Sequence, residues 1–422
     1  ELIIEDMDLI GGDNCQYVIS NNNGTTTITG DTNITARDEW YAFDVYYWPQ
    51  NGKGYGAVEV IFDEDMTGTV EGKVQYASDG TDNENWLKKA KLTIESGNFD
   101  IVIEDGTGKD NASIEIVNGS FTSDVSAYLA EGSAFVKDED GNYVVADKDE
   151  IKDSKFYISD EDDLKEAIDY QADGVTWVLK DSFEVKEMIE ITKNNVTFDG
   201  NGETLTFAED ISGDGDGNNS FIEIEDVKGI VIKDINLDGN NKVHHGINIF
   251  THADKTQAEL EVDNVVIENC KGYAITNNAS KVTVTDLETS GNGWGGINVD
   301  NSTSGDDCGA ELIINNANIK DSNSVKIENA NNKNIDAVIK DGTYAGDVFI
   351  ADGVNNAELR IISGTFAKDV EKYIAEDSHI VKIDGEYVVM DEEEYEEYLD
   401  DERGSGRHSY SLKEGKTERD DE

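Results

Sequence analysis

The sequence predicts an all-β chain folded as a β-solenoid, and three observations lead to that class. One closing unit occurs twice, at residues 116–145 (IVNGSFTSDVSAYLAEGSAFVKDEDGNYVV) and 361–389 (IISGTFAKDVEKYIAEDSHIVKIDGEYVV). Upstream of each copy, alternating apolar strands are separated by turns with Gly, Asn or Asp. Forty glycines against a single proline, Pro49, suit many tight turns between uninterrupted strands. Self-similar short units bury their apolar faces only by stacking on one another, so a solenoid follows.

The coils can be followed along the chain through matching apolar positions, which in the second half are spaced by about 22 to 34 residues. These positions are Ile4, Ile28, Val60, Ile94 and Ile116 in the first half, and Phe198, Ile232, Val262, Val284, Ile314, Ile339 and Ile361 in the second. We therefore expect two consecutive solenoid segments, residues 1–150 and 151–390. An acidic helix and a basic tail follow over residues 391–422.

A short helix is expected between the two segments, where SDEDDLKEAIDYQADGVTWVL (159–179) interrupts the strand pattern. Ser159 or Asp160 can cap it, and acidic residues favour its first turn. Its apolar face consists of Leu164, Ala167 and Ile168. Such a helix would cover the open end of a solenoid, whose unpaired sheet edge otherwise invites aggregation.

That helix, followed by ITKNNVTFDGNGETLTF (191–207) and by coils such as SGNGWGGINVDN (290–301), resembles the pectate-lyase-like right-handed parallel β-helix superfamily. The GTF-DV-YLAEG-YVV pattern of the closing unit resembles repeats in large surface and adhesin-like proteins of anaerobic microbes. The resemblance covers most of residues 1–390 and implies a right-handed parallel β-helix. It implies no single activity, because the superfamily includes lyases, hydrolases and plain surface proteins.

The composition limits the partners and the compartment. A formal charge of −58, from 34 basic and 92 acidic residues, repels nucleic acid and anionic membrane surfaces and attracts divalent cations and basic surfaces. Halophilic adaptation also produces such acidity. No run of about 18 apolar residues predicts a membrane span. The chain opens at Glu1 without Met, which we interpret as the trimmed start of an extracellular protein. Three cysteines, Cys15, Cys270 and Cys308, leave the disulfide state open.

Arginine is scarce, and this argues against catalysis. Enzymes of the resembled superfamily that cleave uronates use basic residues, often Arg, to abstract a proton and hold carboxylates. The chain has Arg37, Arg360, Arg403, Arg407 and Arg419, with none from 38 to 359. The hydrolase branch needs clustered Asp with His and basic partners on successive coils, and no such set stands out. We expect no catalytic residues.

Two patterns could bind metal. His244, His245 and His252 span about 26 Å if extended, too far for one ion, so we interpret them as surface or turn histidines. DGDGNNSFIEIE (214–225) matches a calcium loop, with Asn219 where that loop has Gly. The predicted ligands are Asp214, Asp216, Asn218 and Glu225. A polar insertion loop between coils is the alternative.

The densest aromatic segment is WYAFDVYYW (40–48). As a strand, it places Tyr41, Phe43, Val45 and Tyr47 on one face, which we assign to the core. The opposite face carries Trp40, Tyr46 and Trp48 together with Asp44. That row is a predicted platform for sugar rings, and cover by a loop or a neighbouring molecule is the alternative.

The tail predicts assembly. RHSYSLK (407–413) alternates as a strand in a basic stretch, so we expect it to bind an acidic neighbouring subunit and build a head-to-tail polymer. A solvated or folded-back tail is the alternative. The predicted contact residues are Arg403, Arg407, Tyr410, Leu412 and Lys413.

Together these features predict a non-catalytic extracellular solenoid, a structural or adhesive component of a cell surface, sheath or fibre that forms homo-oligomers or polymers. A carbohydrate-active β-helix lyase or hydrolase and a glycan-binding module are the alternatives. We expect no cofactor, with calcium bound at residues 214–225 as the alternative.

Overall fold

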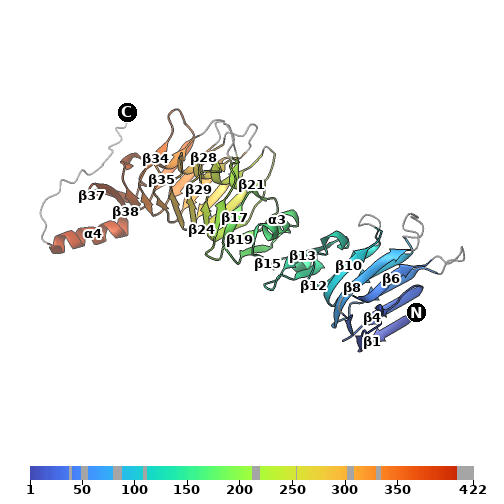
Figure 1. Ribbon diagram of the computed structural model, residues 1–422. Coiled ribbons are helices and arrows are strands. Elements are labelled where there is room, and N and C mark those ends of the chain that lie inside the picture. The colour runs from blue at the N-terminus through green and yellow to red at the C-terminus, as the bar shows by residue number, and fades with distance from the viewer. Residues whose placement is uncertain are drawn as a thin grey trace. The chain divides into compact units, whose positions relative to one another are not determined.

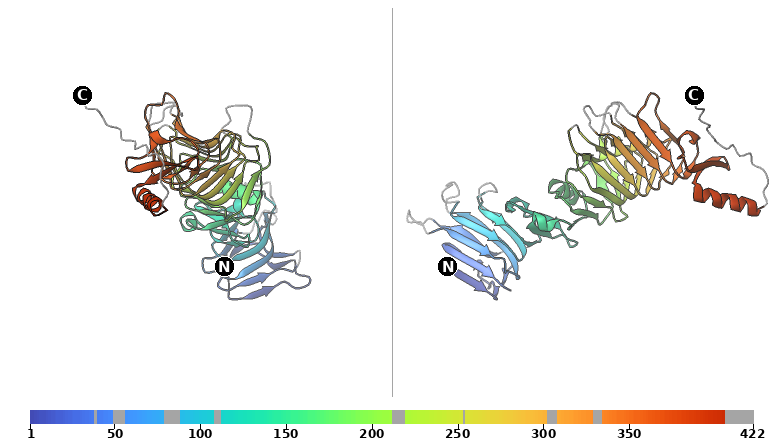
Figure 2. Two further views of the ribbon diagram at one scale, coloured as in Figure 1. Left: turned by 90° about the vertical axis from the view of Figure 1, so that its left-hand side faces the viewer. Right: turned by 180° about the vertical axis from the view of Figure 1, so that it is seen from behind.

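The computed structural model describes residues 1–37, 40–48, 56–78, 88–107, 112–211, 219–252, 254–301, 308–328 and 334–405. Parallel strands dominate this part of the chain, as Figures 1 and 2 show, so the prediction of an all-β chain with long parallel sheets is confirmed. The chain divides into two compact units, residues 1–158 with 165–178, and residues 159–164 with 179–422. Among the described residues, no helix is long and apolar enough to cross a membrane.

The first unit contains two sheets. The five-stranded sheet consists of β1 (Leu2–Glu5), β4 (Gly24–Thr29), β7 (Val58–Phe62), β9 (Ala90–Ile94) and β11 (Ile114–Ile116). The nine-stranded sheet consists of β2 (Asp8–Ile10), β3 (Tyr17–Ile19), β5 (Asn33–Thr35), β6 (Tyr41–Tyr47), β8 (Thr69–Ser78), β10 (Asn98–Asp105), β12 (Gly119–Phe121), β13 (Ser133–Lys137) and β14 (Tyr143–Asp147). Their strands pair in parallel until the antiparallel hairpin β13–β14.

Fifteen strands between β17 and β38 belong to a seventeen-stranded sheet that also includes β15 and β16. Its strands are β15 (Lys155–Ile158), β16 (Thr176–Leu179), β17 (Phe183–Val185), β19 (Thr197–Asp199), β20 (Thr204–Phe207), β22 (Ile230–Asp238), β24 (Glu259–Glu268), β26 (Lys281–Val284), β27 (Leu287–Ser290), β29 (Ala310–Ile314), β30 (Asn318–Ile319), β32 (Ile335–Ile339), β33 (Thr343–Tyr344), β35 (Ala357–Ile361), β36 (Gly364–Phe366), β37 (Ser378–Ile383) and β38 (Glu386–Asp391).

A seven-stranded parallel sheet completes the second unit and carries the candidate site. Its strands are β18 (Ile189–Ile191), β21 (Ser220–Glu225), β23 (His245–Phe250), β25 (Tyr273–Asn278), β28 (Gly295–Asp300), β31 (Asn323–Ile327) and β34 (Asp347–Ile350). One buried residue of each strand pairs with the next: Ile189, Ile222, Ile247, Ile275, Ile297, Val325 and Val348. Each strand therefore places its buried apolar residue beside that of the strand before it.

The predicted coil positions pair across the stack. All seven positions of the second half, from Phe198 to Ile361, are in register with their neighbours and are fully buried. In the first half, Ile28 and Ile94 both pair with Phe62 instead of Val60. Val60 lies two residues before Phe62 and faces the same core. Because side chains alternate with a period of two residues along a strand, the sequence pattern fits either position equally well.

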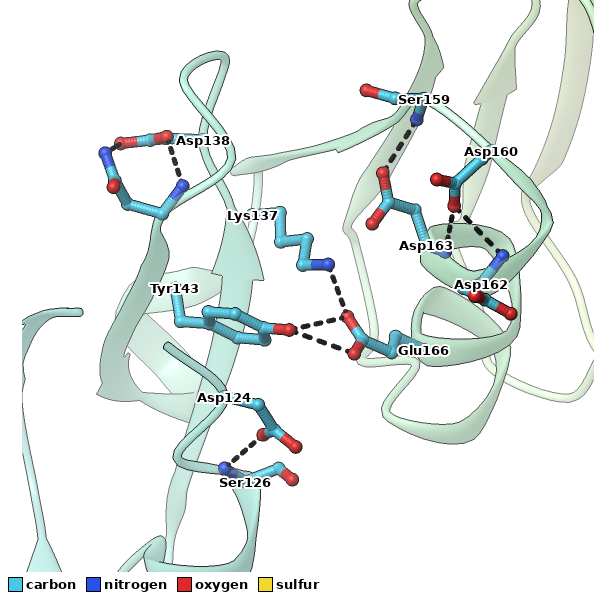
Figure 3. Close-up of polar contacts among 11 residues, drawn as sticks. Asp124, Ser126, Lys137, Asp138, Tyr143, Ser159, Asp160, Asp162, Asp163 and Glu166 are labelled. Atoms are coloured by element: carbon cyan, nitrogen blue, oxygen red, sulfur yellow. Dashed lines mark hydrogen bonds and ion pairs between the residues drawn. The ribbon is translucent and has the colours of Figure 1, made fainter. Parts of the chain in front are cut away.

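The described residues form three α-helices, α2 (Lys148–Ile151) and α3 (Glu161–Asp169) between strands and α4 (Glu392–Ser405) after the last strand. As predicted, Asp160 caps α3, because its Oδ1 accepts hydrogen bonds from the backbone N–H of Asp162 and Asp163, both at 3.0 Å (Figure 3). Leu164 and Ala167 are buried, and Ile168 is half-buried. Helix α4 is the expected acidic helix after β38.

Candidate functional site

The predicted aromatic row lies at β6 in the first unit, but its side chains are arranged differently. Tyr46 and Trp48 adjoin, with ring centroids 5.9 Å apart. Trp40 precedes the strand; it and Trp48 are each 42% exposed. A register shift between β6 and β8 turns Tyr41 out of the predicted core face, and its ring stacks on Tyr17 with 5.1 Å between centroids. The face therefore carries two aromatic pairs and the separate indole of Trp40.

Asp44 departs from the prediction as well, because it is only 3% exposed. Its carboxylate accepts hydrogen bonds from the backbone N–H of Asn21 and from Ser20 Oγ, the latter at 3.2 Å. Burial raises the pKa of Asp44 to about 6, although these hydrogen bonds oppose the shift. The centre of the predicted platform is a buried, hydrogen-bonded acid.

The predicted calcium loop is only partly described, with Glu225 inside the described residues. The other three predicted ligands lie outside them: Asp214, Asp216 and Asn218. Glu225 meets Asp226 and His252, whose Nδ1 lies 2.9 Å from Glu225 Oε1 and 3.0 Å from Asp226 Oδ2. One ligand atom from each residue lies within 4.8 Å of the others, so these side chains could hold a metal ion. Two carboxylates with an imidazole suit zinc or manganese at least as well as calcium.

The interpretation of all three histidines as surface or turn residues is wrong for His245, which is 7% exposed. Its Nδ1 accepts a hydrogen bond from the backbone N–H of Tyr273 at 3.0 Å, which places the proton of the neutral ring on Nε2. Burial, together with the neighbouring His244, lowers the pKa of His245 to about 4. The ring is therefore neutral at neutral pH.

His245 belongs to an aromatic cluster that sequence reasoning missed, formed by His244, His245, Tyr273 and Trp294. The rings of His244 and His245 stack at 4.6 Å and 11°, and those of His245 and Tyr273 lie 6.0 Å apart at 9°. The indole of Trp294 crosses these near-parallel rings at 68° to 74°. It therefore lies across the edges of the ring stack, and 49% of its surface is exposed.

The backbone holds this cluster in place. The backbone N–H of Trp294 donates to the carbonyl oxygen of Gly272 at 3.0 Å, and Asn323 Nδ2 donates to the backbone carbonyl oxygen of Trp294 at 2.7 Å. The glycine at position 272 is explained by steric crowding, because a Cβ there would lie 2.6 Å from His245 Nδ1 and 2.7 Å from His244 Cδ2. Only glycine lets the chain pass beside the two imidazoles.

A polar row crosses the same sheet, with one residue from each of four successive strands. Asn248, Thr276, Asn298 and Lys326 pair in register, about 4.8 Å apart per strand. Thr276 Oγ1 donates to Asn248 Oδ1 at 2.5 Å, and Lys326 pairs with Glu328. The two asparagines are buried, whereas the hydroxyl, ammonium and Glu328 carboxylate are half-buried. These groups provide donors and acceptors on the outer face of the sheet.

Two carboxylates extend the row on earlier strands. Glu190 and Glu223 pair in register, and Asn248 Nδ2 donates to Glu223 Oε2 at 3.5 Å. Burial raises the pKa of Glu223, and the nearby Glu190 and Glu225 charges add to the shift against the Asn248 hydrogen bond.

A sequence signal for the cluster existed in hindsight. Three successive coils place His or an aromatic residue directly before or at the start of a strand, in HHGINIF (244–250), GYAITNN (272–278) and GWGGINVD (293–300). Because the strands are parallel, those starts meet at one edge of the sheet. Of the predicted assembly residues, Arg403 lies in α4 without a described side chain, and Arg407, Tyr410, Leu412 and Lys413 lie outside the described residues.

No family model and no curated protein matches this chain. Among solved structures, it is similar to sacteLam55A from Streptomyces sp. SirexAA-E, with 10% identity over 92% of each chain and a TM-score of 0.33. A variant of that protein in complex with glucose aligns with 10% identity over 92% of this chain and 91% of that one, with a TM-score of 0.27.

Proposed function

We propose that the chain is an extracellular right-handed parallel β-helix of the pectate-lyase-like superfamily that binds glycans, as part of a cell surface, sheath or fibre. The observation that supports binding is the indole of Trp294. It contacts the rings of His244, His245 and Tyr273, and 49% of the residue is exposed. Exposed aromatic rings held rigidly beside polar groups provide large contact area at low entropic cost. The half-buried Thr276 and Lys326 supply hydrogen bonds to sugar hydroxyls.

Substitution of Trp294 tests this function. We expect the intact chain to bind oligosaccharides on a glycan array. Trp294→Ala should lower the affinity for the best of these ligands at least about tenfold, measured by calorimetry. Trp40→Ala with Trp48→Ala is the matched control, since these indoles are similarly exposed on the first unit. Loss of binding in that double variant and not in Trp294→Ala would move the site to the predicted aromatic row. Absence of glycan binding by the intact chain would reject the proposal.

Catalysis on the bound glycan is the second candidate, and the adjacent Glu190 and Glu223 favour it. Retaining glycosidases use two carboxyl groups about 5 Å apart, one of them with a raised pKa that acts as the acid. Glu223 has the raised pKa, and the register places Glu190 one strand away. Release of reducing ends from the bound glycan by the intact chain, abolished in Glu223→Gln, would show that the protein is an enzyme. Binding without release supports the non-catalytic proposal.

A further inference from the structure

The two closing units have the same internal structure. In the first, Phe121 of β12 pairs with Tyr143 of the hairpin β13–β14; in the second, Phe366 of β36 pairs with Tyr387 of β37–β38. Lys137 and Lys382 are opposite those tyrosines in the two hairpins. Each unit also has a 3-10 turn at the same place, η3 (Ser126–Tyr128) and η4 (Glu371–Tyr373).

In the first closing unit, an acidic side chain from α3 binds the hairpin at Lys137 and Tyr143, next to the hairpin turn (Figure 3). Lys137 Nζ lies 2.7 Å from Glu166 Oε2, and Tyr143 Oη donates to the same carboxylate at 3.0 Å from Oε1. The ammonium also lies 4.7 Å from the centroid of the Tyr143 ring. Lys137 and Tyr143 are 9% and 7% exposed as a result.

Apolar contacts accompany that carboxylate. Phe135, in the middle of β13, has its ring centroid 6.0 Å from Phe156 of β15 and 5.0 Å from Tyr170, directly after α3. Phe135 is 2% exposed. The segment 155–170 therefore covers the hairpin with a strand, an aromatic contact and a glutamate.

The second closing unit has the same lysine–tyrosine pair without that cover. Helix α4 contacts this hairpin at His379, whose ring stacks on Tyr395 and whose Nε2 lies 2.9 Å from Glu392 Oε2, but His379 alternates to the face opposite Lys382. Lys382 Nζ lies 4.4 Å from the centroid of the Tyr387 ring and 3.3 Å from its hydroxyl oxygen, as in the first copy. Ile380 occupies the position of Phe135, and Val381 that of Val136. Lys382 is exposed, and Ile380, Val381 and Tyr387 are half-buried. Within the described part of the chain, no carboxylate contacts Lys382.

We infer that the surface formed by Ile380, Lys382 and Tyr387, which lie on one face of the hairpin, is a docking site for an acidic strand-helix segment of the kind formed by residues 155–170. The partner places a glutamate between the ammonium of Lys382 and the hydroxyl of Tyr387, and an apolar side chain against Ile380. The internal repeat identifies this chemistry, because the same hairpin in the first copy binds such a segment. The inference is independent of glycan binding.

The probe is a fluorescently labelled peptide of residues 151–172 of this chain, titrated with the intact protein and followed by anisotropy. We expect saturable binding that Lys382→Ala weakens at least about tenfold, the effect of losing a charged hydrogen bond. A peptide carrying Glu166→Gln should be weakened similarly. Lys372→Ala is the matched control, because Lys372 forms a cation–π pair with Tyr373 (4.5 Å) outside this surface.

Three results would overturn the inference. They are absence of peptide binding at several hundred micromolar, binding unaffected by Lys382→Ala, and equal loss in Lys372→Ala. Self-association of the intact chain that Lys382→Ala abolishes, measured by sedimentation, would identify a second copy as the partner and support the same surface. Circular dichroism melting of each variant verifies that the solenoid is still folded.

Discussion

Both units contain the same hairpin, but among the described residues only the first has a strand and a glutamate packed on its lysine–tyrosine face, whereas the second contacts α4 at His379. Phe135 and Lys137 of the first are buried, whereas Ile380 and Lys382 of the second are half-buried and exposed. Their pairing registers are equivalent, so local sequence determines the hairpin in both. What differs is the segment that packs on it. Burial at such a position depends on the next element of the chain and not on the repeat itself.

The two units also bury opposite kinds of titratable group. The first buries the carboxyl of Asp44, and the second buries the imidazole of His245. Each accepts a hydrogen bond from a backbone N–H, of Asn21 and Tyr273 respectively. Desolvation disfavours the charged form in both cases, so it raises the pKa of the acid and lowers that of the base. Stacks of similar construction should therefore respond oppositely to pH.

The largest difference is expected for apolar truncation of the two hairpins. Phe135→Ala should destabilise the first unit by about 3 to 4 kcal/mol, because it leaves a cavity between Phe156 and Tyr170. Ile380→Ala should cost the second unit about 1 kcal/mol, since the side chain is already partly in water. Hydrogen exchange followed by mass spectrometry measures the opening free energy of each hairpin separately. Equal losses in the two variants would contradict the difference in cover.

The opposite pH responses should be nearly as large. For His245, the folded pKa of about 4 lies below the unfolded value of about 6.5, so the unfolded state binds more protons in that window. The second unit should therefore gain about 3 kcal/mol as pH rises from 4 to 6.5. For Asp44, the folded pKa of about 6 lies above the usual value of 3.8, so the folded state binds more protons between these pH values. The first unit should therefore lose about 3 kcal/mol as the pH rises through that range.

Hydrogen exchange between pH 4 and 7, corrected for the intrinsic exchange rate, separates the two slopes. Other carboxylates titrate in the same range, so the variants His245→Asn and Asp44→Asn provide the reference. Each should flatten the slope of its own unit and leave the other unchanged. A common slope for both units, insensitive to either variant, would show that the net charge of the chain controls the pH response.

Much of the stacking was predictable because it repeats. The seven positions proposed for the second half pair in succession, since each strand places one apolar residue beside that of the next. Alternation does not distinguish Val60 from Phe62, because a two-residue slip preserves the face. Nor does it show the register shift that turns Tyr41 outward, because a bulge adds one residue without a sequence signature of its own.

The aromatic cluster was missed for a different reason. His245, Tyr273 and Trp294 come from three segments of the chain, and their proximity depends on the register between β23, β25 and β28. The spacing of the histidines along one extended segment does not contain that register. Asp44 was assigned to an exposed face because strand alternation says nothing of the neighbouring chain around Asn21 that covers it.

A smaller difference is expected for the lysines of the two hairpins. Lys137→Met keeps the apolar stem but leaves Glu166 without its ammonium partner, and it should cost the first unit about 2 kcal/mol after allowance for the partial exposure of Glu166. Lys382→Met should change the second unit by less than about 0.5 kcal/mol. Chemical denaturation with exchange detection compares the two. A matching loss in Lys382→Met would mean that the second hairpin is covered in solution, and adding the 151–172 peptide should make the two variants more alike.

The smallest effect concerns cations and separates the two units again. Among the described residues, a potential metal group is found only in the second unit, at Glu225, Asp226 and His252. A divalent cation at about ten times its Kd should stabilise that unit by about 1.4 kcal/mol and leave the first unchanged. Sodium chloride should instead raise the stability of both units, because it screens repulsion among the acidic side chains of a chain with charge −58.

Titrating zinc, manganese and calcium in turn at constant ionic strength, with exchange detection, distinguishes the two mechanisms. His252→Ala should remove the zinc or manganese effect, and His379→Ala, which breaks a two-residue pair with Glu392, is the matched control. If only calcium stabilises the second unit and His252→Ala has no influence, the predicted loop with Asp214, Asp216 and Asn218 is the better site. If the cations stabilise both units equally, neither site binds and screening alone accounts for the effect.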